Sequence, residues 1–180
     1  IAALISFCGH RSKTPRWEAK KWHILVVIFP AAVAIAGLHA IGSDGRWYVL
    51  ACLVIIWTTD TCAYMVGRLS GKTLLVPRIS PAKTVEGAVG GLVGASIAGL
   101  VLYGTLPIEM NFTRLDWMVL INVTACFSIV GDLTESAFKR AAGIKDSGWI
   151  LPGHGGILDR IDSCLASAPV FAAGVLFATK

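Results

Sequence analysis

Residues 85–106 read VEGAVGGLVGASIAGLVLYGTL, an apolar stretch whose only charged side chain is Glu86. A helix of about 20 apolar residues is long enough to cross the hydrocarbon core of a bilayer. The stretch therefore predicts a transmembrane helix, and similar stretches lie on both sides of it in the chain. We expect membrane spans at about 24–41, 47–66, 85–106, 117–134 and 161–179.

The composition agrees with a membrane protein and argues against a soluble globular one. Of the 180 residues, 55% are hydrophobic and 15% are charged, whereas soluble domains average about 25% charged residues. The mean hydropathy is +0.69. The five cysteines form no C-x-x-C pair, which argues against a disulfide framework and a structural zinc site. The expected fold is an all-α, polytopic transmembrane helix bundle that forms one domain over residues 1–180.

The basic residues are distributed unequally between the two ends of the predicted spans. Thirteen of the 16 Lys and Arg residues precede the first span or lie in segments 67–84 and 135–160, all on one side. Arg46, Arg114 and Lys180 are on the other side. The positive-inside rule places the basic side in the cytoplasm. We expect a multi-pass protein of the bacterial inner membrane or an equivalent membrane, and no nucleic-acid partner despite the net charge of +5.

Two further features concern the ends and the packing of the spans. Trp47 and Trp117 lie near span ends, where an interfacial aromatic belt is expected. Small residues four apart, such as Gly90 and Gly94, predict close helix packing in lipid, with a glycine-lined substrate path as the alternative. The first residues show no initiator Met, basic region or cleavage site, so we expect the chain to be the C-terminal part of a longer protein.

Three carboxylates lie inside or at the edge of apolar runs: Asp60, Asp132 and Asp162. A charge at such a depth is expensive, so each is a functional candidate, with a structural Lys or Arg pairing as the alternative. Helical spacing places Asp159 with Asp162, and Asp132 with Glu135, on shared helix faces. Carboxylates without matching Cys or His favour a hard cation, Mg²⁺ before Zn²⁺.

Two glycine-rich segments could approach phosphate. Residues 67–73, GRLSGKT, are one residue short of a Walker motif and follow a predicted membrane helix, so we reject that interpretation. Arg68 and Lys72 could still bind an anion there. Residues 153–156, GHGG, permit close backbone approach to a phosphate, with a turn that caps the next helix as the alternative. Together with the carboxylates, these segments favour phosphoryl chemistry on a lipid headgroup.

Residues 136–162, SAFKRAAGIKDSGWILPGHGGILDRID, resemble the signature of the phosphatidate cytidylyltransferases, also called CDP-diacylglycerol synthases, without a departure. Residues 60–72, 79–87 and 131–136 are similar to further blocks of that family. The resemblance extends over about residues 45 to 175. The front of the chain departs from the family, whose members carry several more N-terminal spans.

The resemblance implies that CTP and phosphatidate give CDP-diacylglycerol and pyrophosphate at cytoplasmic catalytic loops, with Mg²⁺ and room for a second cation, in a homodimer. It implies catalytic roles for Asp132, Lys139, Arg140, Lys145, Asp146, His154, Asp159, Arg160 and Asp162. It implies metal binding by Asp132, Asp146, Asp159 and Asp162. It implies substrate binding by Asp60, Arg68, Lys72, Arg78, Ser80, Lys83, Ser136, Gly155 and Gly156.

Two alternatives remain open. A CTP-dependent lipid kinase of the polyprenol type would transfer the γ-phosphoryl group to an alcohol, and the complete motif of residues 136–162 argues against it. An ion-coupled transporter subunit could use Asp60 and Asp132 to coordinate an ion, but the chain shows no internal repeat. The D-G-x2-A-R motif of a CDP-alcohol phosphotransferase does not occur in the sequence.

Overall fold

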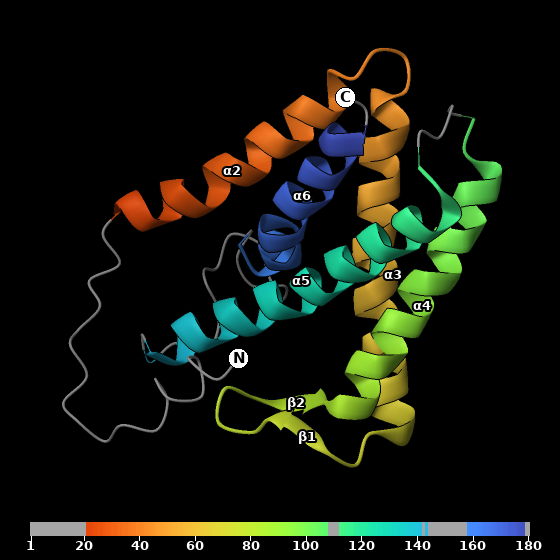
Figure 1. Ribbon diagram of the computed structural model, residues 1–180. Coiled ribbons are helices and arrows are strands. Elements are labelled where there is room, and N and C mark those ends of the chain that lie inside the picture. Colours follow the sequence, from red (N-terminus) through yellow and green to blue (C-terminus); the bar gives the residue numbers. More distant parts are fainter. Residues whose placement is uncertain (1–20, 108–111, 142, 144–157, 179–180) are drawn as a thin grey trace.

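The computed structural model describes residues 21–107, 112–141, 143 and 158–178. Within this part of the chain, the elements are helices and one small hairpin (Figure 1). The helices are α2 (Lys21–His39), α3 (Gly45–Ser70), α4 (Val85–Thr105), α5 (Arg114–Ala141) and α6 (Leu158–Ala178). The hairpin consists of strands β1 (Leu74–Val76) and β2 (Ser80–Thr84). The expected helical bundle is confirmed.

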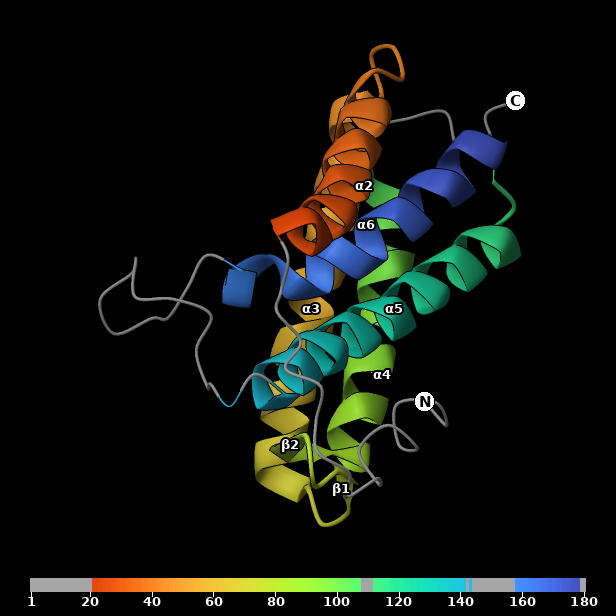
Figure 2. The ribbon, with the colours of Figure 1, turned by 90° about the vertical axis from the view of Figure 1, so that its left-hand side faces the viewer.

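Each helix overlaps one expected span. Four of the described helices are long and apolar enough to cross a membrane, and α2 contributes a shorter apolar stretch, Ile28–His39. Successive helices run in alternating directions, as Figures 1 and 2 show. The hairpin therefore lies at the same end of the bundle as the C-terminus of α5 and the start of α6, and the α2–α3 turn lies at the opposite end.

The bundle core is built around Trp117 near the start of α5, whose side chain is fully buried. Its ring packs edge-on against Phe112 and Phe171, with centroid distances of 5.6 and 6.0 Å. Its Nε1–H donates a hydrogen bond to the Gly99 carbonyl oxygen at 2.9 Å. The expectation that Trp117 belongs to an interfacial belt is wrong, because Phe171 of α6 packs against this ring and Gly99 of α4 accepts its hydrogen bond.

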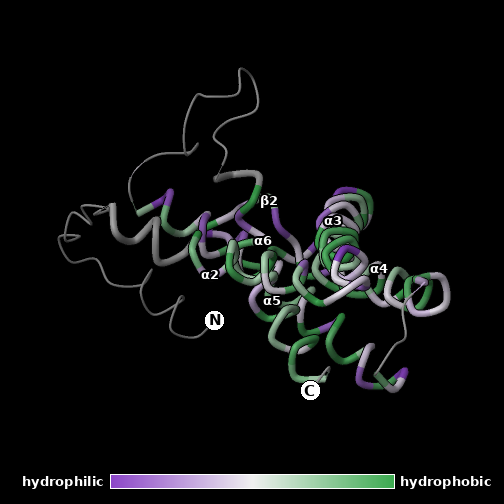
Figure 3. Tube along the Cα trace, turned by 90° about the horizontal axis from the view of Figure 1, so that it is seen from above, coloured by the Kyte–Doolittle hydropathy of each residue, from purple (hydrophilic) through white to green (hydrophobic). Residues whose placement is uncertain are grey.

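The outward faces of the helices are apolar. Trp57, Val93, Ile97 and Val119 are each more than half exposed and point away from the core. Figure 3 shows hydrophobic residues along the helices, whereas β2 is hydrophilic. Exposed apolar side chains of this kind fit contact with lipid tails. In lipid there is no water around them, so the hydrophobic effect does not drive them into the protein interior.

The hairpin was not expected, since the sequence predicts a loop over 67–84. Its strands are antiparallel and pair Leu74 with Thr84 and Val76 with Ser80. The turn is closed by the Ile79 N–H, which donates to the Val76 carbonyl oxygen at 3.1 Å. Pro77 occupies the second turn position, where its fixed φ is favourable. Because the strands are short and Pro77 and Pro81 interrupt the segment, the sequence shows no strand pattern here.

Helices α3 and α4 pack closely because glycines of α4 face α3. A Cβ atom built on Gly91 would lie 2.9 Å from the Thr59 carbonyl oxygen, and one built on Gly94 would lie 2.5 Å from Cys62 Sγ. Both glycines are buried. The glycine spacing thus serves helix packing, as expected, and it brings the C-terminal half of α3 beside the start of α4.

We predict that Gly91→Ala destabilises the bundle and that Gly104→Ala, in the same helix, does not. Alanine favours a helix over glycine by about 1 kcal/mol, but at Gly91 the added methyl meets a backbone oxygen that cannot rotate away. Overpacking of this kind costs about 1–3 kcal/mol. At Gly104 nothing lies within 4 Å of the added atom. Thermal unfolding in detergent measures both, and equal midpoints for the two variants would contradict the close approach of α3 and α4.

Candidate active site

The end of the bundle that carries the hairpin gathers acidic side chains from three helices. Asp60 belongs to α3, Asp132 to α5 and Asp162 to α6. The Asp60 side chain is accessible, whereas Asp132 and Asp162 are half-buried. The Asp60 and Asp162 carboxylates each interact electrostatically with Asp132 and with one another. Carboxylates that are widely separated in the sequence therefore form one cluster.

Lys83 of β2 supplies a cation to this cluster. Its Nζ forms an ion pair with Asp132 Oδ2. The side chains of Lys83 and Asp132 are 25% and 32% exposed, so solvent screens this contact less than it screens a surface pair. The Lys83 ammonium also interacts electrostatically with Asp60. The ion pair joins the hairpin to α5 and offsets part of the repulsion among the three carboxylates.

Serine residues orient two of the carboxylates. The hydroxyl of the fully buried Ser128 donates a hydrogen bond to Asp60 Oδ1 at 3.3 Å. The Ser163 N–H donates to Asp162 Oδ1 at 2.7 Å. The Ser163 side chain also interacts with Asp60. Ser128 lies one helical turn before Asp132, so α5 provides both a carboxylate and a donor to this cluster.

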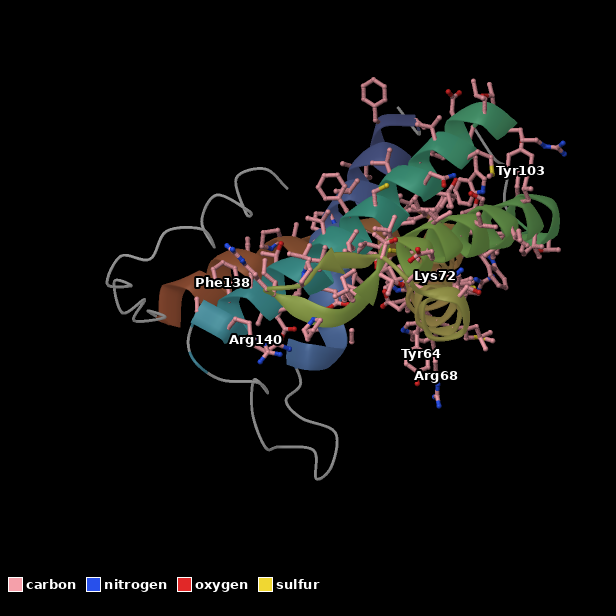
Figure 4. The ribbon with its side chains drawn as sticks, turned by 90° about the horizontal axis from the view of Figure 1, so that it is seen from below. Tyr64, Arg68, Lys72, Tyr103, Phe138 and Arg140 are labelled. Atoms are coloured by element: carbon pink, nitrogen blue, oxygen red, sulfur yellow. The ribbon has the colours of Figure 1, made fainter. Side chains whose placement is uncertain are left out.

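Two cations at the C-terminal end of α5 bind protein groups. Lys139 Nζ lies 2.9 Å from Glu135 Oε2, one turn away on the same helix. Arg140 Nε donates to the Ile79 carbonyl oxygen in the hairpin turn at 3.3 Å. Figure 4 shows Arg140 beside the hairpin at this end of α5. Both cations were predicted to hold phosphate, and both lie at the carboxylate end of the bundle.

Other predicted residues lie farther from the carboxylates. Arg68 Nη1 donates to the Tyr64 hydroxyl oxygen at 2.9 Å, and both side chains point outward from α3 in Figure 4. Lys72 and Arg78 are exposed on the hairpin segment. Ser80 on β2 and Ser136 on α5 are half-buried. Among the predicted basic residues of segment 67–84, the structure brings Lys83 of the hairpin into contact with the cluster, whereas Arg68 of α3 pairs with Tyr64 instead.

Two of the four predicted metal ligands, Asp146 and Asp159, lie outside the described side chains. Lys145, Asp146, His154, Gly155 and Gly156 fall within residues 144–157, outside the described residues. Asp159 and Arg160 belong to the first turn of α6, but their side chains are also outside those described. Their roles stay predictions.

The described carboxylates fit a hard cation by their chemistry, because oxygen donors are what Mg²⁺ prefers. Among the described side chains, however, no three His, Cys, Asp or Glu groups are arranged to hold one metal ion. Asp132 Oδ2 forms an ion pair with the Lys83 ammonium instead. A magnesium ion would therefore need Asp132 and Asp162 to be joined by residues such as Asp146 and Asp159.

Sequence reasoning missed three residues of the cluster. Ser128 and Ser163 contact Asp60 and Asp162, and the Glu135 side chain interacts with Asp162. Helical spacing places Glu135 on one face with Asp132, but the sequence assigns Glu135 no role. The available signal was helical spacing: Ser128 is four residues before Asp132, and Ser163 follows Asp162.

An apolar groove of about 600 Å³ lies elsewhere, between α3 and α4. Its walls include Met65, Leu69, Val89 and Val93. It contains neither Lys83 nor any of the three clustered aspartates. The groove and the polar cluster are therefore separate features.

The sequence profile described as "Cytidylyltransferase family" matches residues 2–178, nearly the whole chain. The protein belongs to the cytidylyltransferase family. The polar cluster at the end of α3, α5 and α6, with the adjoining hairpin, is accordingly its candidate active site.

Several curated proteins are similar to this chain in sequence. A phosphatidate cytidylyltransferase of Staphylococcus saprophyticus is 46% identical over 148 residues, which is 81% of this chain and 55% of the relative. That of Staphylococcus haemolyticus is 48% identical over 135 residues, 73% of this chain and 50% of the relative. That of Staphylococcus epidermidis is 48% identical over 130 residues, 71% of this chain and 48% of the relative. The chain spans about half the length of these relatives.

We predict an energetic coupling between Lys83 and Asp132. Lys83→Met leaves the half-buried Asp132 carboxylate beside two other carboxylates without its cation, so this variant should unfold at lower temperature. Adding Asp132→Asn to Lys83→Met should restore part of the loss, with a coupling energy of about 0.5–3 kcal/mol. Lys72→Met, which removes an exposed cation of the same segment, is the control. Additive effects of the Lys83 and Asp132 changes on the unfolding midpoint would show that the ion pair contributes no stability.

Proposed function

We propose that the protein transfers the cytidylyl group of CTP to phosphatidate, giving CDP-diacylglycerol and pyrophosphate. The observation that carries this proposal is the convergence of Asp60, Asp132 and Asp162 beside the basic hairpin, at one end of an apolar bundle. Such a site serves a reaction between a water-soluble polyanion and a phosphate anchored in the membrane. The names of the staphylococcal relatives support the same reaction.

The chemistry requires positioning and charge neutralisation more than a strong base. The second pKa of a phosphate monoester is about 6, so phosphatidate is largely dianionic at neutral pH. One of its oxygens attacks the α-phosphorus of CTP in line, and a new phosphorus–oxygen bond forms. The bond between the α-phosphorus and the oxygen that bridges to the β-phosphorus breaks, and its electron pair leaves on pyrophosphate. No proton has to be removed from the nucleophile.

The basic residues have the task of holding phosphates. Lys83 is placed by β2 beside the carboxylates, and Arg140 and Lys139 are placed by the last turns of α5. We assign them, together with Arg160 and Lys145, to the triphosphate and to the lipid phosphate. Two polyanions repel one another strongly at short distance, and these cations lower that repulsion.

We further propose Mg²⁺ as the cofactor, held by Asp132 and Asp162 with Asp146 and Asp159. When bound, the ion neutralises phosphate charge and orients the triphosphate. The donor set supports this choice, because the described residues of the cluster offer carboxylate oxygens and no thiolate or imidazole. Asp60, held by Ser128, is the next candidate for this ion or for a second cation.

The sidedness and the assembly are also proposals. The hairpin and the basic end of α5 lie at the same end of the bundle, which the positive-inside rule places in the cytoplasm, where CTP is found.

The resemblance to the cytidylyltransferases supports a homodimer. Light scattering of the detergent-solubilised protein would test it, and a monomer mass at working concentration would contradict it.

We predict that the intact protein in detergent micelles converts phosphatidate and labelled CTP into CDP-diacylglycerol and pyrophosphate only when Mg²⁺ is present. Asp132→Asn and Asp162→Asn should each lower turnover at least 100-fold, because each removes a carboxylate that we propose to hold Mg²⁺. Asp116→Asn is the matched control, since Asp116 is an exposed carboxylate at the start of α5.

The products decide between the proposed reaction and its rivals. CDP together with a phosphorylated lipid, formed from an alcohol in place of phosphatidate, would indicate a lipid kinase. Full turnover in both aspartate variants would contradict the site assignment. Absence of any turnover in the wild-type protein would favour an ion-coupled transporter.

A further inference from the structure

We infer that Glu86 is a positioning residue that clamps the base of the β1–β2 hairpin and thereby sets the place of Lys83. Glu86 lies in the first turn of α4, outside the carboxylate cluster. None of the roles derived above uses it. This inference rests on the proposed function, since Lys83 is the group through which Glu86 would act.

The Glu86 carboxylate binds the backbone at the point where the chain leaves α3. Its Oε2 accepts the Lys72 N–H at 3.1 Å, and both carboxylate oxygens accept the Thr73 N–H, at 3.2 and 3.1 Å. Hydrogen bonds to an ionised carboxylate are about twice as strong as those between neutral groups. Lys72 and Thr73 immediately precede β1, so one side chain of α4 holds the start of the hairpin.

The end of the hairpin is tied to the same place. The Val85 N–H donates to the Thr73 carbonyl oxygen at 2.9 Å, and the Thr84 hydroxyl accepts the Gly87 N–H at 3.1 Å as the N-cap of α4. The space is crowded: a Cβ atom built on Gly71 would lie 2.8 Å from Thr84 Oγ1. The first and last residues of the hairpin therefore meet in one tight junction.

Lys83 lies directly beside this junction. It precedes Thr84 in β2, and its Nζ reaches Asp132 on α5. The far end of the hairpin is held separately, by the hydrogen bond from Arg140 to the Ile79 carbonyl oxygen. The hairpin thus has two charged supports: the Arg140 guanidinium holds its turn, and the Glu86 carboxylate holds the end that carries Lys83. Displacing a functional group by about 1 Å can lower a rate about 100-fold, which gives such a support a measurable effect.

A simpler role for Glu86 is the favourable interaction of any acid with a helix N-terminus. Asp116 provides the comparison, because it occupies the first turn of α5 and accepts a hydrogen bond from Thr113 Oγ1 at 2.7 Å. Within the described part of the chain, Asp116 forms no hydrogen bond to the hairpin. Asp116→Asn and Glu86→Gln both remove a carboxylate charge from a first helical turn, and only the second alters the clamp.

The test uses the intact protein in micelles with phosphatidate, CTP and Mg²⁺. We expect Glu86→Ala to lower kcat about 10- to 100-fold, and Glu86→Gln to lower it less, because the amide keeps one acceptor oxygen. Amide hydrogen exchange should be faster at Lys72 and Thr73 in both variants. Their unfolding midpoints should stay close to that of Asp116→Asn, and Asp116→Asn should keep the wild-type kcat. If Glu86→Ala fails to fold, Glu86→Gln supplies the same comparison.

A double variant tests whether Glu86 affects turnover through Lys83. Glu86→Gln combined with Lys83→Met should be little slower than Lys83→Met alone, because residues that act as one unit have non-additive effects. Fully multiplicative losses would overturn action through Lys83.

Three other results would overturn the inference. The first is an unchanged kcat in Glu86→Ala when the wild-type protein turns over. The second is a slow Glu86 variant with unchanged exchange at Lys72 and Thr73, and the third is a loss explained entirely by a lower unfolding midpoint. Absence of product from the wild-type protein would instead overturn the proposed function, and the role of Glu86 with it.

Discussion

The arrangement of this end of the bundle depends on the repulsion among the carboxylates that α3, α5 and α6 bring together. Asp60, Asp132 and Asp162 interact with one another, and a cation has to compensate them. Lys83 provides that cation, and it can do so only because β2 carries it beneath α5. The hairpin, the tight packing of α3 against α4 and the Ser128 and Ser163 donors all serve to hold charged groups in one place.

The elements that position the site are in contact with one another: α3 packs on α4, the hairpin connects these two helices, and α5 holds the hairpin turn. Gly91 and Gly94 allow α3 and α4 to approach, so that the end of α3 and the start of α4 lie side by side. The segment between them is short enough to close into a hairpin at that junction, and Arg140 of α5 holds its turn. The close packing of α3 and α4 thus lies next to the hairpin that carries Lys83 to Asp132.

The helices and the grouping of Asp60, Asp132 and Asp162 were predictable from the sequence, because apolar runs and isolated carboxylates are strong one-dimensional signals. The hairpin was not, since Pro77 and Pro81 interrupt the alternation that marks a strand. Trp117 near a span end looked interfacial, but only the packing of α6 shows that its ring is buried. The pairing of Lys83 with Asp132 joins residues far apart in the chain, and neither spacing nor composition could identify it. Spacing and composition likewise could not show that the Arg68 side chain points outward from α3.

We propose that the carboxylates of α5 and α6 hold a divalent cation that in turn holds the nucleotide. Electron–nuclear double resonance on the protein loaded with Mn²⁺ and CTP measures it directly, through the coupling between the ion and the phosphorus nuclei. We expect a ³¹P coupling in the wild-type protein that is lost in the Asp132→Asn/Asp162→Asn double variant and kept in Asp116→Asn. An undiminished protein-bound signal in the double variant would contradict the account.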